Sequence, residues 1–540
     1  MGKFGLNRYT MDRFLKRCCE IYEDRSFLAM EGEECMTYGE FYKRVEKHRV
    51  ILREQGLVKG DVMALLAAGS PNWAVMWMAA MTSGIVAVPI MEDFSREDVI
   101  YILNHSEAKG ICLDSRFLSW DLDEFNKVDF LYDLGKGEFL RENDSARGDT
   151  SDMTVTLEEY DPAEYVYTSG TTGFSKGVIL THGNLVSNLF EGTDLIDSCF
   201  DSESLVLPLV PMGHTFGSTS AFLSTMYKGP RIVFLKRKPT VPYLKEVFKR
   251  NRPTILGAVP LIFEKIYQKQ VLPVKSKNLM TRLLLGKFPP TRKLFHRMAG
   301  KKVLDFLGGK MSCIIIGGAP FSPEVELFMR EGRIPYVLGY GLTETSPLLT
   351  FCSLESMKPG SVGHAISDTD IRIVNVLDGV GDVEVRGPQV MAGYLKDPEG
   401  TAGMFTADGW FITGDKGYLD KDGYLFLKGR SKNVIIGASG ENIYPEAIEA
   451  LISGEPLVEE VLVGMEEGKL VARVFPNEDY LNSNGMDKDR KLREFAFEEL
   501  RSRVNKKLPL SSYLYKILEQ VEPFAKTATR KIKRPHLFST

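Results

Sequence analysis

The sequence lacks the cysteine pattern of a disulfide-bonded or zinc-binding protein. Its 540 residues include seven cysteines, an odd number, with no CxxC pair and no Cys/His spacing typical of a zinc site. Disulfide frameworks are found mainly in small extracellular domains. We therefore expect a protein of a reducing compartment, the cytoplasm, without structural disulfides or zinc.

An excess of either charge is also missing. The formal net charge is −4, from 68 Lys and Arg against 72 Asp and Glu. A chain so close to neutral exerts no overall attraction on DNA or RNA, and we expect no nucleic-acid partner. Residues 1–20 carry charges throughout and contain no apolar segment of the kind found in signal peptides, so we expect the chain to stay inside the cell.

Long uncharged runs are scarce. One of them, residues 74–91, approaches the roughly 20 apolar residues that a membrane-spanning helix needs. Thr82, Ser83, Gly84 and Pro89 interrupt its second half. A buried helix, a turn and a buried strand explain this pattern better than a membrane span.

The chain has enough length and apolar content for more than one domain. With 540 residues and 44% hydrophobic side chains, it exceeds the size at which one core keeps growing. Short β-branched runs alternate with helical patterns up to about residue 360, which predicts an α/β fold with parallel sheets. The expected strands are 62–67, 84–90, 111–113, 204–208, 231–235, 255–259 and 313–316.

Beyond residue 361 the pattern changes. Gly- and Asp-punctuated segments at 370–376, 381–386 and 423–427 predict a β-rich subdomain. A helix, two strands, a helix and a strand then predict a small α+β domain, with helices at 444–451 and 488–508 and strands at 458–464 and 469–475. We place the boundary so that the large domain covers 1–431 and the small domain 432–540.

The most informative segment joins two apolar strands near residue 170. It is a loop of glycines and hydroxyl residues with one lysine, and such a loop can direct backbone N–H groups, hydroxyls and one positive charge at a polyphosphate. A Walker A loop is excluded, because Ser175 stands where a second Gly is required and Gly177 follows the lysine where Ser or Thr is required. The candidate phosphate-binding residues are Thr168, Ser169, Gly170, Thr171, Thr172, Gly173 and Lys176.

This loop resembles the signature loop of the adenylate-forming superfamily, which includes acyl-CoA synthetases, adenylation domains of nonribosomal peptide synthetases and firefly luciferase. The common form has Pro where this chain has Ser175. Further segments that resemble the superfamily's motifs follow in the same order over nearly the whole chain. They are 317–320, 339–346, 410–415, 429–433, 439–445 and 526–532.

The resemblance implies a nucleotide site. It places Gly318, Ala319 and Pro320 in a turn against adenine, and Tyr340, between Gly339 and Gly341, on the adenine ring. Thr343 would reach the α-phosphate, and Glu344 would hold Mg²⁺, which takes few protein ligands beside water and phosphates. Asp415 would bind the two ribose hydroxyls, with Arg430 as a second ribose contact.

The resemblance also assigns roles to the small domain. Lys432 falls at the superfamily's hinge, with Asn433 where an acidic residue is usual, so the small domain is expected to be mobile. Gly440 would line the path of the coenzyme A arm. Lys531 aligns with the catalytic lysine, although Arg530 replaces the usual Gly. The expected catalytic set is therefore Lys531, Thr343, Glu344 and Lys176.

The activity implied is ATP-dependent ligation of a carboxylic acid to coenzyme A through an acyl-AMP. Segments 259–267 and 338–347 are most similar to long-chain fatty-acid:CoA ligases, and His214, in 211–217, would lie beside the acyl carboxylate. Gly213 and Ser218 stand where some of those enzymes carry aromatic residues. The chain length of the acid therefore stays open, as do an aryl or alicyclic acid and an acyl carrier protein as acceptor.

Two rival functions are weaker. An amino-acid-adenylating domain would normally place Asp in the acyl pocket to bind the ammonium, and residues 205–231 contain none. A catalytically silent protein that binds AMP or acyl-CoA would have no need of Lys531, Glu344 and Asp415.

One local charge feature remains. Residues 275–302 contain nine Lys or Arg and no Asp or Glu, interleaved with leucines, methionines and phenylalanines. A solvated basic helix explains this pattern, and so does peripheral contact with an anionic membrane at the inner face of the cell.

Overall fold

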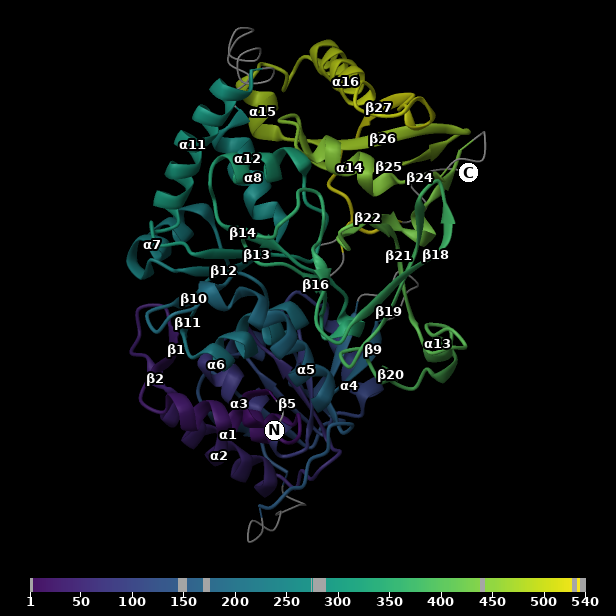
Figure 1. Cartoon of the computed structure of the whole chain (residues 1–540). Coiled ribbons are helices and arrows are strands. Elements are labelled where there is room, and N and C mark those ends of the chain that lie inside the picture. The colour runs from purple at the N-terminus through teal and green to yellow at the C-terminus, as the bar shows by residue number, and fades with distance from the viewer. Residues whose placement is uncertain are drawn as a thin grey trace.

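The computed structural model describes residues 3–143, 153–168, 175–272, 274, 288–437, 442–526 and 532–534. Several sequence-predicted positions lie outside these residues: 169–174 of the candidate phosphate loop, 275–287 of the basic segment, Gly440 and Lys531. Figure 1 shows a large body, from purple to green along the chain, and a smaller yellow-green part packed against one end of it.

The N-terminal half of the large body is built on an eight-stranded sheet in the order β20-β9-β8-β4-β3-β5-β6-β7. Strands β8, β4, β3, β5 and β6 are parallel, and the two edges are antiparallel. Their bounds are β3 Val62–Leu66, β4 Val86–Ile90, β5 Gly110–Leu113, β6 Phe130–Asp133, β7 Glu138–Arg141, β8 Pro162–Thr168, β9 Lys176–Thr181 and β20 Gly393–Tyr394. The helices of this half are α1 Met11–Tyr22, α2 Tyr38–Glu54, α3 Pro71–Thr82, α4 Arg96–Ser106 and α5 His182–Thr193.

The uncharged run at 74–91 forms helix α3, a turn and strand β4. Every residue of α3 from Trp73 to Thr82 is buried, and so is every residue of β4. The expected buried helix, turn and strand are therefore confirmed. Among the described residues, no helix is both long enough and apolar enough to cross a membrane.

A second sheet of seven strands has the order β14-β13-β12-β10-β11-β1-β2 and is parallel except at β1–β2. Its strands are β1 Ser26–Met30, β2 Met36–Thr37, β10 Leu205–Pro208, β11 Arg231–Phe234, β12 Ile255–Ala258, β13 Cys313–Ile316 and β14 Tyr336–Leu338. Strands β10 to β13 are almost entirely buried, as expected of parallel strands covered on both faces. The associated helices are α6 Ser224–Lys228, α7 Val241–Asn251, α8 Pro260–Gln270, α11 Pro289–Phe306 and α12 Pro323–Glu331.

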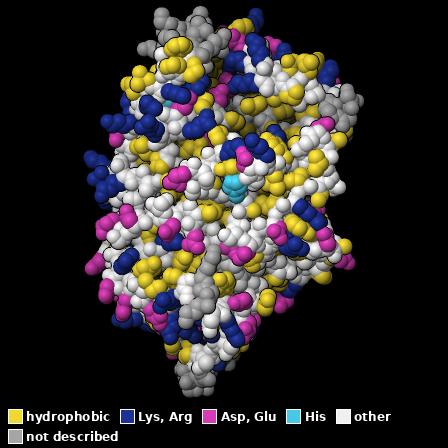
Figure 2. Space-filling view, in the orientation of Figure 1, with side chains coloured by type: hydrophobic (Ala, Val, Ile, Leu, Met, Phe, Trp, Pro, Cys, Tyr) yellow, Lys and Arg dark blue, Asp and Glu magenta, His cyan; other side chains and the backbone are white. Residues whose placement is uncertain are grey.

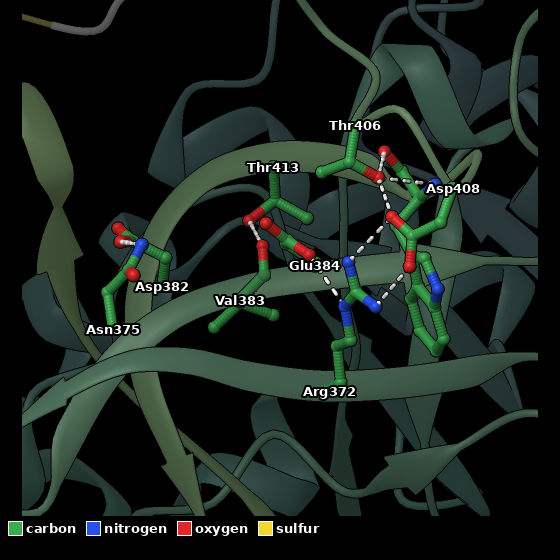
Figure 3. A network of polar contacts seen from close by, with 9 residues as sticks. Arg372, Asn375, Asp382, Val383, Glu384, Thr406, Asp408 and Thr413 are labelled. Atoms are coloured by element: carbon green, nitrogen blue, oxygen red, sulfur yellow. Dashed lines mark hydrogen bonds and ion pairs between the residues drawn. The ribbon is translucent and has the colours of Figure 1, made fainter.

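The expected β-rich subdomain is an antiparallel sheet in the order β18-β19-β21-β22. Its strands are β18 Asp370–Leu377, β19 Val380–Arg386, β21 Phe411–Leu419 and β22 Leu425–Arg430. The Arg372 guanidinium contacts the carboxylates of Glu384 and Asp408 at 2.7 Å each (Figure 3). It also lies over the ring of Trp410, 4.4 Å from the ring centre. This network joins the segment just before β21 to β18 and β19. Between the sheets lie the short strands β15 Tyr340–Gly341, β16 Leu348–Phe351 and β17 His364–Ala365, and α13 Pro398–Ala402 precedes β21.

The C-terminal part has its own apolar core, centred on Ile452, Val474 and Leu500. Its elements are β23 Ile435–Ile436, β24 Asn442–Ile443, α14 Pro445–Ser453, β25 Val458–Glu466, β26 Lys469–Pro476, α15 Glu478–Ser483, α16 Arg490–Asn505 and β27 Lys516–Glu519. They confirm the helices and strands expected there. The division between residues 431 and 432 stays a prediction, and a short 3₁₀ turn, Ser431–Asn433, lies at that point.

This part packs on α8 and α12 of the large body. The Gln268 side chain donates to the carbonyl of Ser453 at 3.0 Å, and Lys265 pairs with Glu459 at 3.1 Å. These contacts join the two bodies through polar groups, which can exchange for water more readily than an apolar interface can.

One buried carboxyl stands out in the first sheet. Glu164 lies on β8 and is fully buried; one oxygen accepts a hydrogen bond from the Trp77 indole at 3.2 Å, and the other has no partner. Burial raises the pKa of Glu164 to about 8, and the indole bond offsets only part of that rise. The folded protein therefore holds this carboxyl protonated at neutral pH, where the unfolded chain ionises it.

A Glu164→Gln variant should be more stable than the parent at pH 8, and the difference should shrink toward pH 5. Because the folded pKa is raised, the parent loses stability as pH rises from about 4.5 to about 8, at about 1.4 kcal/mol per pH unit. Glutamine does not titrate and can still accept the indole bond. Urea unfolding of both proteins between pH 5 and 8.5 measures the difference in the free energy of unfolding. A difference that does not change with pH would contradict the raised pKa of Glu164.

Candidate active site

The sequence-predicted turns of the second sheet meet at its carboxyl end. Strands β13 and β14 are parallel neighbours, so the segments that leave them, 317–320 and 339–341, emerge side by side. The Gly339 N–H donates to the Ile316 carbonyl at 3.0 Å. A side chain on Gly317 would come within 3.3 Å of the Gly339 carbonyl oxygen. Gly318, with a φ of +87°, faces open space, and Ala319 and Pro320 are exposed beside it.

Two residues expected at the nucleotide's base and sugar are directly bonded. The Tyr340 hydroxyl donates to Asp415 Oδ2 at 2.6 Å, and Arg430 Nε lies 2.9 Å from Asp415 Oδ1. Thr413 places the carboxylate, because its hydroxyl donates to the Val383 carbonyl and accepts from the Asp415 N–H. Burial and the nearby carboxylate raise the pKa of Tyr340, so its phenol remains a hydrogen-bond donor.

Thr343 and Glu344 lie three and four residues beyond Tyr340, in the 3₁₀ turn Thr343–Thr345. Both are half-buried. The Glu344 carbonyl accepts from the Met391 N–H at 2.9 Å, and its Oε1 accepts from the Tyr394 hydroxyl at 2.9 Å. The turn is thereby attached to the segment around β20.

Lys176 is the first residue of β9 and pairs across the hairpin with Thr168, the last residue of β8. Its ammonium lies 2.8 Å from Asp397 Oδ2 and 4.6 Å from the centre of the Tyr394 ring. The lysine lowers the pKa of the Asp397 carboxyl. Sequence reasoning missed Tyr394 and Asp397, because their contacts with Lys176 and Glu344 arise only when β20 pairs with β9.

His214 precedes a π-helical segment, Phe216–Leu223. Its Nδ1 accepts the Phe216 N–H at 3.1 Å. Phe216 borders a small internal cavity of about 10 Å³, about the space of one water molecule, whose lining includes residues of β10, β12 and β13. Irregular π turns of this kind are frequent at functional sites.

The structure explains why Gly213 replaces an aromatic residue. A side chain there would begin 3.1 Å from the Met91 backbone nitrogen, at the end of β4. The segment after β10 passes so close to the end of β4 that a side chain at position 213 would require the backbone at Ile90 and Met91 to shift.

The hinge candidate Lys432 lies in the turn between β22 and β23, and burial and Arg430 lower the pKa of its ammonium. The neighbouring Asn433 amide donates to Glu446 of α14. An acidic residue at position 433 could not donate that bond, which accounts for the departure from the usual Asp or Glu.

The described residues on either side of Lys531 are held to the small domain. Lys526 pairs with Glu460, and Arg534 pairs with Glu449. Lys526 and Ile532 also form an antiparallel bridge. The basic C-terminal segment is therefore anchored on both sides of Lys531, whereas a purely solvated tail would make no such contacts.

Comparison with known proteins decides the family. A family model described as AMP-binding enzyme matches residues 15–395. The chain belongs to the AMP-binding enzyme family. Among curated relatives, the long-chain-fatty-acid–CoA ligase FadD15 of Mycobacterium bovis is 28% identical over 464 residues, covering 79% of this chain and 75% of its own. A chloroplastic long-chain-fatty-acid–[acyl-carrier-protein] ligase of Arabidopsis thaliana, AEE15, is 26% identical and covers 86% and 76%.

The structural similarity to solved proteins covers more of the chain than the family model does. The o-succinylbenzoate coenzyme A synthetase of Bacillus subtilis, solved with ATP and magnesium ion, superposes with a TM-score of 0.74 at 22% identity and covers 97% of this chain and 98% of its own. Lys176, Glu344 and Tyr394 lie inside the part matched by the AMP-binding model, and Asp415, Arg430 and the small domain lie after it. The whole chain thus has the architecture of an AMP-binding enzyme with its C-terminal domain.

Proposed function

We propose that this AMP-binding enzyme is an ATP-dependent acid:CoA ligase that activates a fatty acid as its acyl-AMP and then transfers the acyl group to coenzyme A. The observation that carries the proposal is a continuous set of contacts between motifs far apart in sequence. Lys176 contacts Tyr394, and Tyr394 binds Glu344. Tyr340, four residues before Glu344 in the same motif, binds Asp415. The names of the curated relatives support the reaction class.

The chemistry requires such a site. A carboxylate is a poor electrophile, because attack adds charge to an anion and would expel oxide. When the substrate carboxylate attacks the α-phosphorus of ATP, a mixed anhydride forms and pyrophosphate leaves. The thiol of coenzyme A then attacks the acyl carbon and AMP leaves. The nucleophiles belong to the substrates, so the enzyme needs no covalent intermediate of its own.

The first step brings two anions together, and oriented charges must meet the charge that develops. Lys176 and Thr343 would meet the phosphate oxygens, and Lys531 would approach from the small domain. The half-buried Glu344 carboxylate suits Mg²⁺, which prefers oxygen ligands and takes few of them from protein. When bound, Mg²⁺ would neutralise phosphate oxygens.

The second step needs the thiol where pyrophosphate has just left. We propose that the small domain turns about Lys432, withdrawing Lys531 and bringing Gly440 to the thiol path. The polar interface at Gln268 and Lys265 suits such an exchange, since its hydrogen bonds can pass to water.

The acid is proposed to be a fatty acid, since curated relatives are named for long-chain fatty acids. The π-helical segment after His214 carries buried apolar side chains, among them Phe216 and Phe222, which would suit an alkyl chain with His214 beside its carboxylate. Solved neighbours named for aromatic acids make an aryl acid the second candidate.

A thioester assay across fatty, aromatic and alicyclic acids tests this proposal. Fatty acids should give the highest kcat/KM, because each methylene buried in an apolar site contributes about 0.8 kcal/mol. A higher kcat/KM for an aryl acid would show that the substrate is an aryl acid and not a fatty acid. Failure of every acid to support ATP–pyrophosphate exchange, with AMP still bound, would point to a silent binding protein.

Lys531→Ala should separate the two half-reactions. Adenylation should fall on the order of 10²- to 10³-fold, as when one oxyanion donor is removed, while thioester formation from supplied acyl-AMP should persist. The ratio of the two rates in mutant and parent measures the effect. Lys516→Ala, at an exposed position of β27 in the same domain, is the matched control and should keep the parental ratio. Normal acyl-AMP formation by Lys531→Ala would move the catalytic role to another lysine, with Lys526 the first candidate, or mean that Arg530 has displaced the loop.

We also propose that α11 contacts an anionic membrane surface. Its outer face carries four cations, Lys293, Arg297, Lys301 and Lys302, with no ion-pair partner among the described residues. Leu294 and Met298, on the same face, are each 61% exposed. Figure 2 shows Lys and Arg gathered with hydrophobic side chains on this side of the molecule. Cations mixed with exposed apolar side chains suit the boundary between headgroups and acyl chains.

Replacing Lys293, Arg297 and Lys301 with Gln should weaken binding to phosphatidylserine vesicles on the order of 10²-fold at low salt, because each cation near such a surface contributes about 1 kcal/mol. Sedimentation measures the bound fraction. The matched control replaces Lys16, Lys43 and Lys47 on α1 and α2, which removes the same charge from a distant surface. Equal effects of the two variants, or no vesicle binding by the parent, would favour a solvated helix face.

A further inference from the structure

Glu344 is held at two points by one short segment. The Met391 N–H donates to its carbonyl, and the Tyr394 hydroxyl donates to its Oε1, both at 2.9 Å. The first bond fixes the backbone of the turn, and the second fixes the end of the side chain. The carboxylate therefore has a defined direction that it would lack with water alone as its partner.

Tyr394 is itself firmly placed. Gly393 and Tyr394 form β20, which pairs antiparallel with Ile179 and Val178 of β9. The Tyr394 N–H donates to the Thr401 hydroxyl at 2.8 Å, and the side chain is 8% exposed. Because both backbone and ring are packed, the hydroxyl cannot swing away from Glu344.

The backbone conformation of β20 requires glycine at position 393. Gly393 has a φ of +151°, and a side chain there would come within 2.9 Å of Thr401. The next N–H, of Leu395, donates to the Gly177 carbonyl at 2.8 Å. The segment that carries Tyr394 is thus attached directly to the strand that leaves the phosphate loop.

The phenol acts only as a donor. An ionised carboxylate can only accept, so the Tyr394 hydroxyl is the donor in its bond to Glu344 Oε1. A donor on Oε1 leaves Oε2 and the remaining lone pairs as acceptors for a cation. Groups that bind a ligand's side chain in this way orient it, and their loss typically weakens metal affinity about 10- to 100-fold.

The same ring contacts Lys176. Its ammonium lies 4.6 Å from the ring centre, within the range of a cation–π contact, and pairs with Asp397 three residues along. One side chain therefore touches the expected cation ligand through its hydroxyl and the expected phosphate lysine through its ring.

From this geometry we propose that Tyr394 is a positioning residue, which orients the Glu344 carboxylate for the catalytic divalent cation and aligns it with Lys176. The proposal rests on the proposed function, in which Glu344 holds Mg²⁺. Tyr394 need not touch the cation or the reacting atoms.

Tyr394→Phe separates the two contacts, because it removes the hydroxyl and keeps the ring beneath Lys176. At saturating ATP, the Mg²⁺ concentration for half-maximal adenylation should rise about 10- to 100-fold. The KM for the acid should stay at the parental value. A direct readout is Mn²⁺ binding in the presence of a non-hydrolysable ATP analogue, followed by the electron paramagnetic resonance of free Mn²⁺, which should show the same weakening.

Tyr336→Phe is the matched control. The Tyr336 hydroxyl also donates to a buried glutamate, Glu326, at 3.2 Å, but that pair lies outside the candidate site. This variant should keep the parental metal dependence although it loses an equivalent bond. Thermal unfolding of both variants shows whether a change in metal affinity accompanies loss of the fold.

Glu344→Gln distinguishes failure of this inference from failure of the proposed function. If Glu344→Gln weakens Mn²⁺ binding and Tyr394→Phe does not, the positioning role is wrong and the metal assignment stands. If neither variant changes Mn²⁺ binding, the metal role of Glu344 is wrong and the inference falls with it. Weakening by Tyr336→Phe equal to that by Tyr394→Phe would also overturn the inference.

Discussion

The parallel pairing of β12, β13 and β14 is the constraint on which the site depends. Parallel strands place the turns that follow them at one edge of the sheet, which is where ligands bind in α/β folds. The hydrogen bond from the Gly339 N–H to the Ile316 carbonyl is the last one between β13 and β14. It brings segments 317–320 and 339–341 together. The β-rich sheet then supplies Asp415 and Arg430 from the other side, through the bond to Tyr340.

Much of this architecture could be predicted because it depends on local patterns. Continuous apolar runs marked the parallel strands, and all seven expected strands form within about two residues of the expected bounds. The small domain followed from alternating patterns of the same kind. The motifs that carry Tyr340 and Asp415 have distinctive residues in a fixed order, so the resemblance could assign them before any contact was known.

Contacts made by ordinary residues could not be predicted in this way. Nothing in the sequence distinguishes Tyr394 from other tyrosines, and Asp397 has the ordinary role of a helix N-cap. Only the pairing of β20 with β9 brings the two residues to Lys176. The bond from Asn433 to Glu446 is similar, because it depends on how the hinge turn meets α14. A single sequence records residue types and spacing, whereas these roles arise from where distant segments meet.

The pairing of β20 with β9 has a consequence for how the chain is made. Its partners, Gly393 and Ile179, lie roughly 200 residues apart. During synthesis, β9 can form its hairpin with β8 early, but its outer edge has no partner until the ribosome has added β20. An unpaired edge can recruit strands from other chains. A ribosome that stalls after β9 and before β20 would leave the outer edge of β9 unpaired. Synthesis of β20, in the segment that positions Glu344, would then cover this edge. Assembly of the site and protection of the nascent chain from aggregation would therefore occur together.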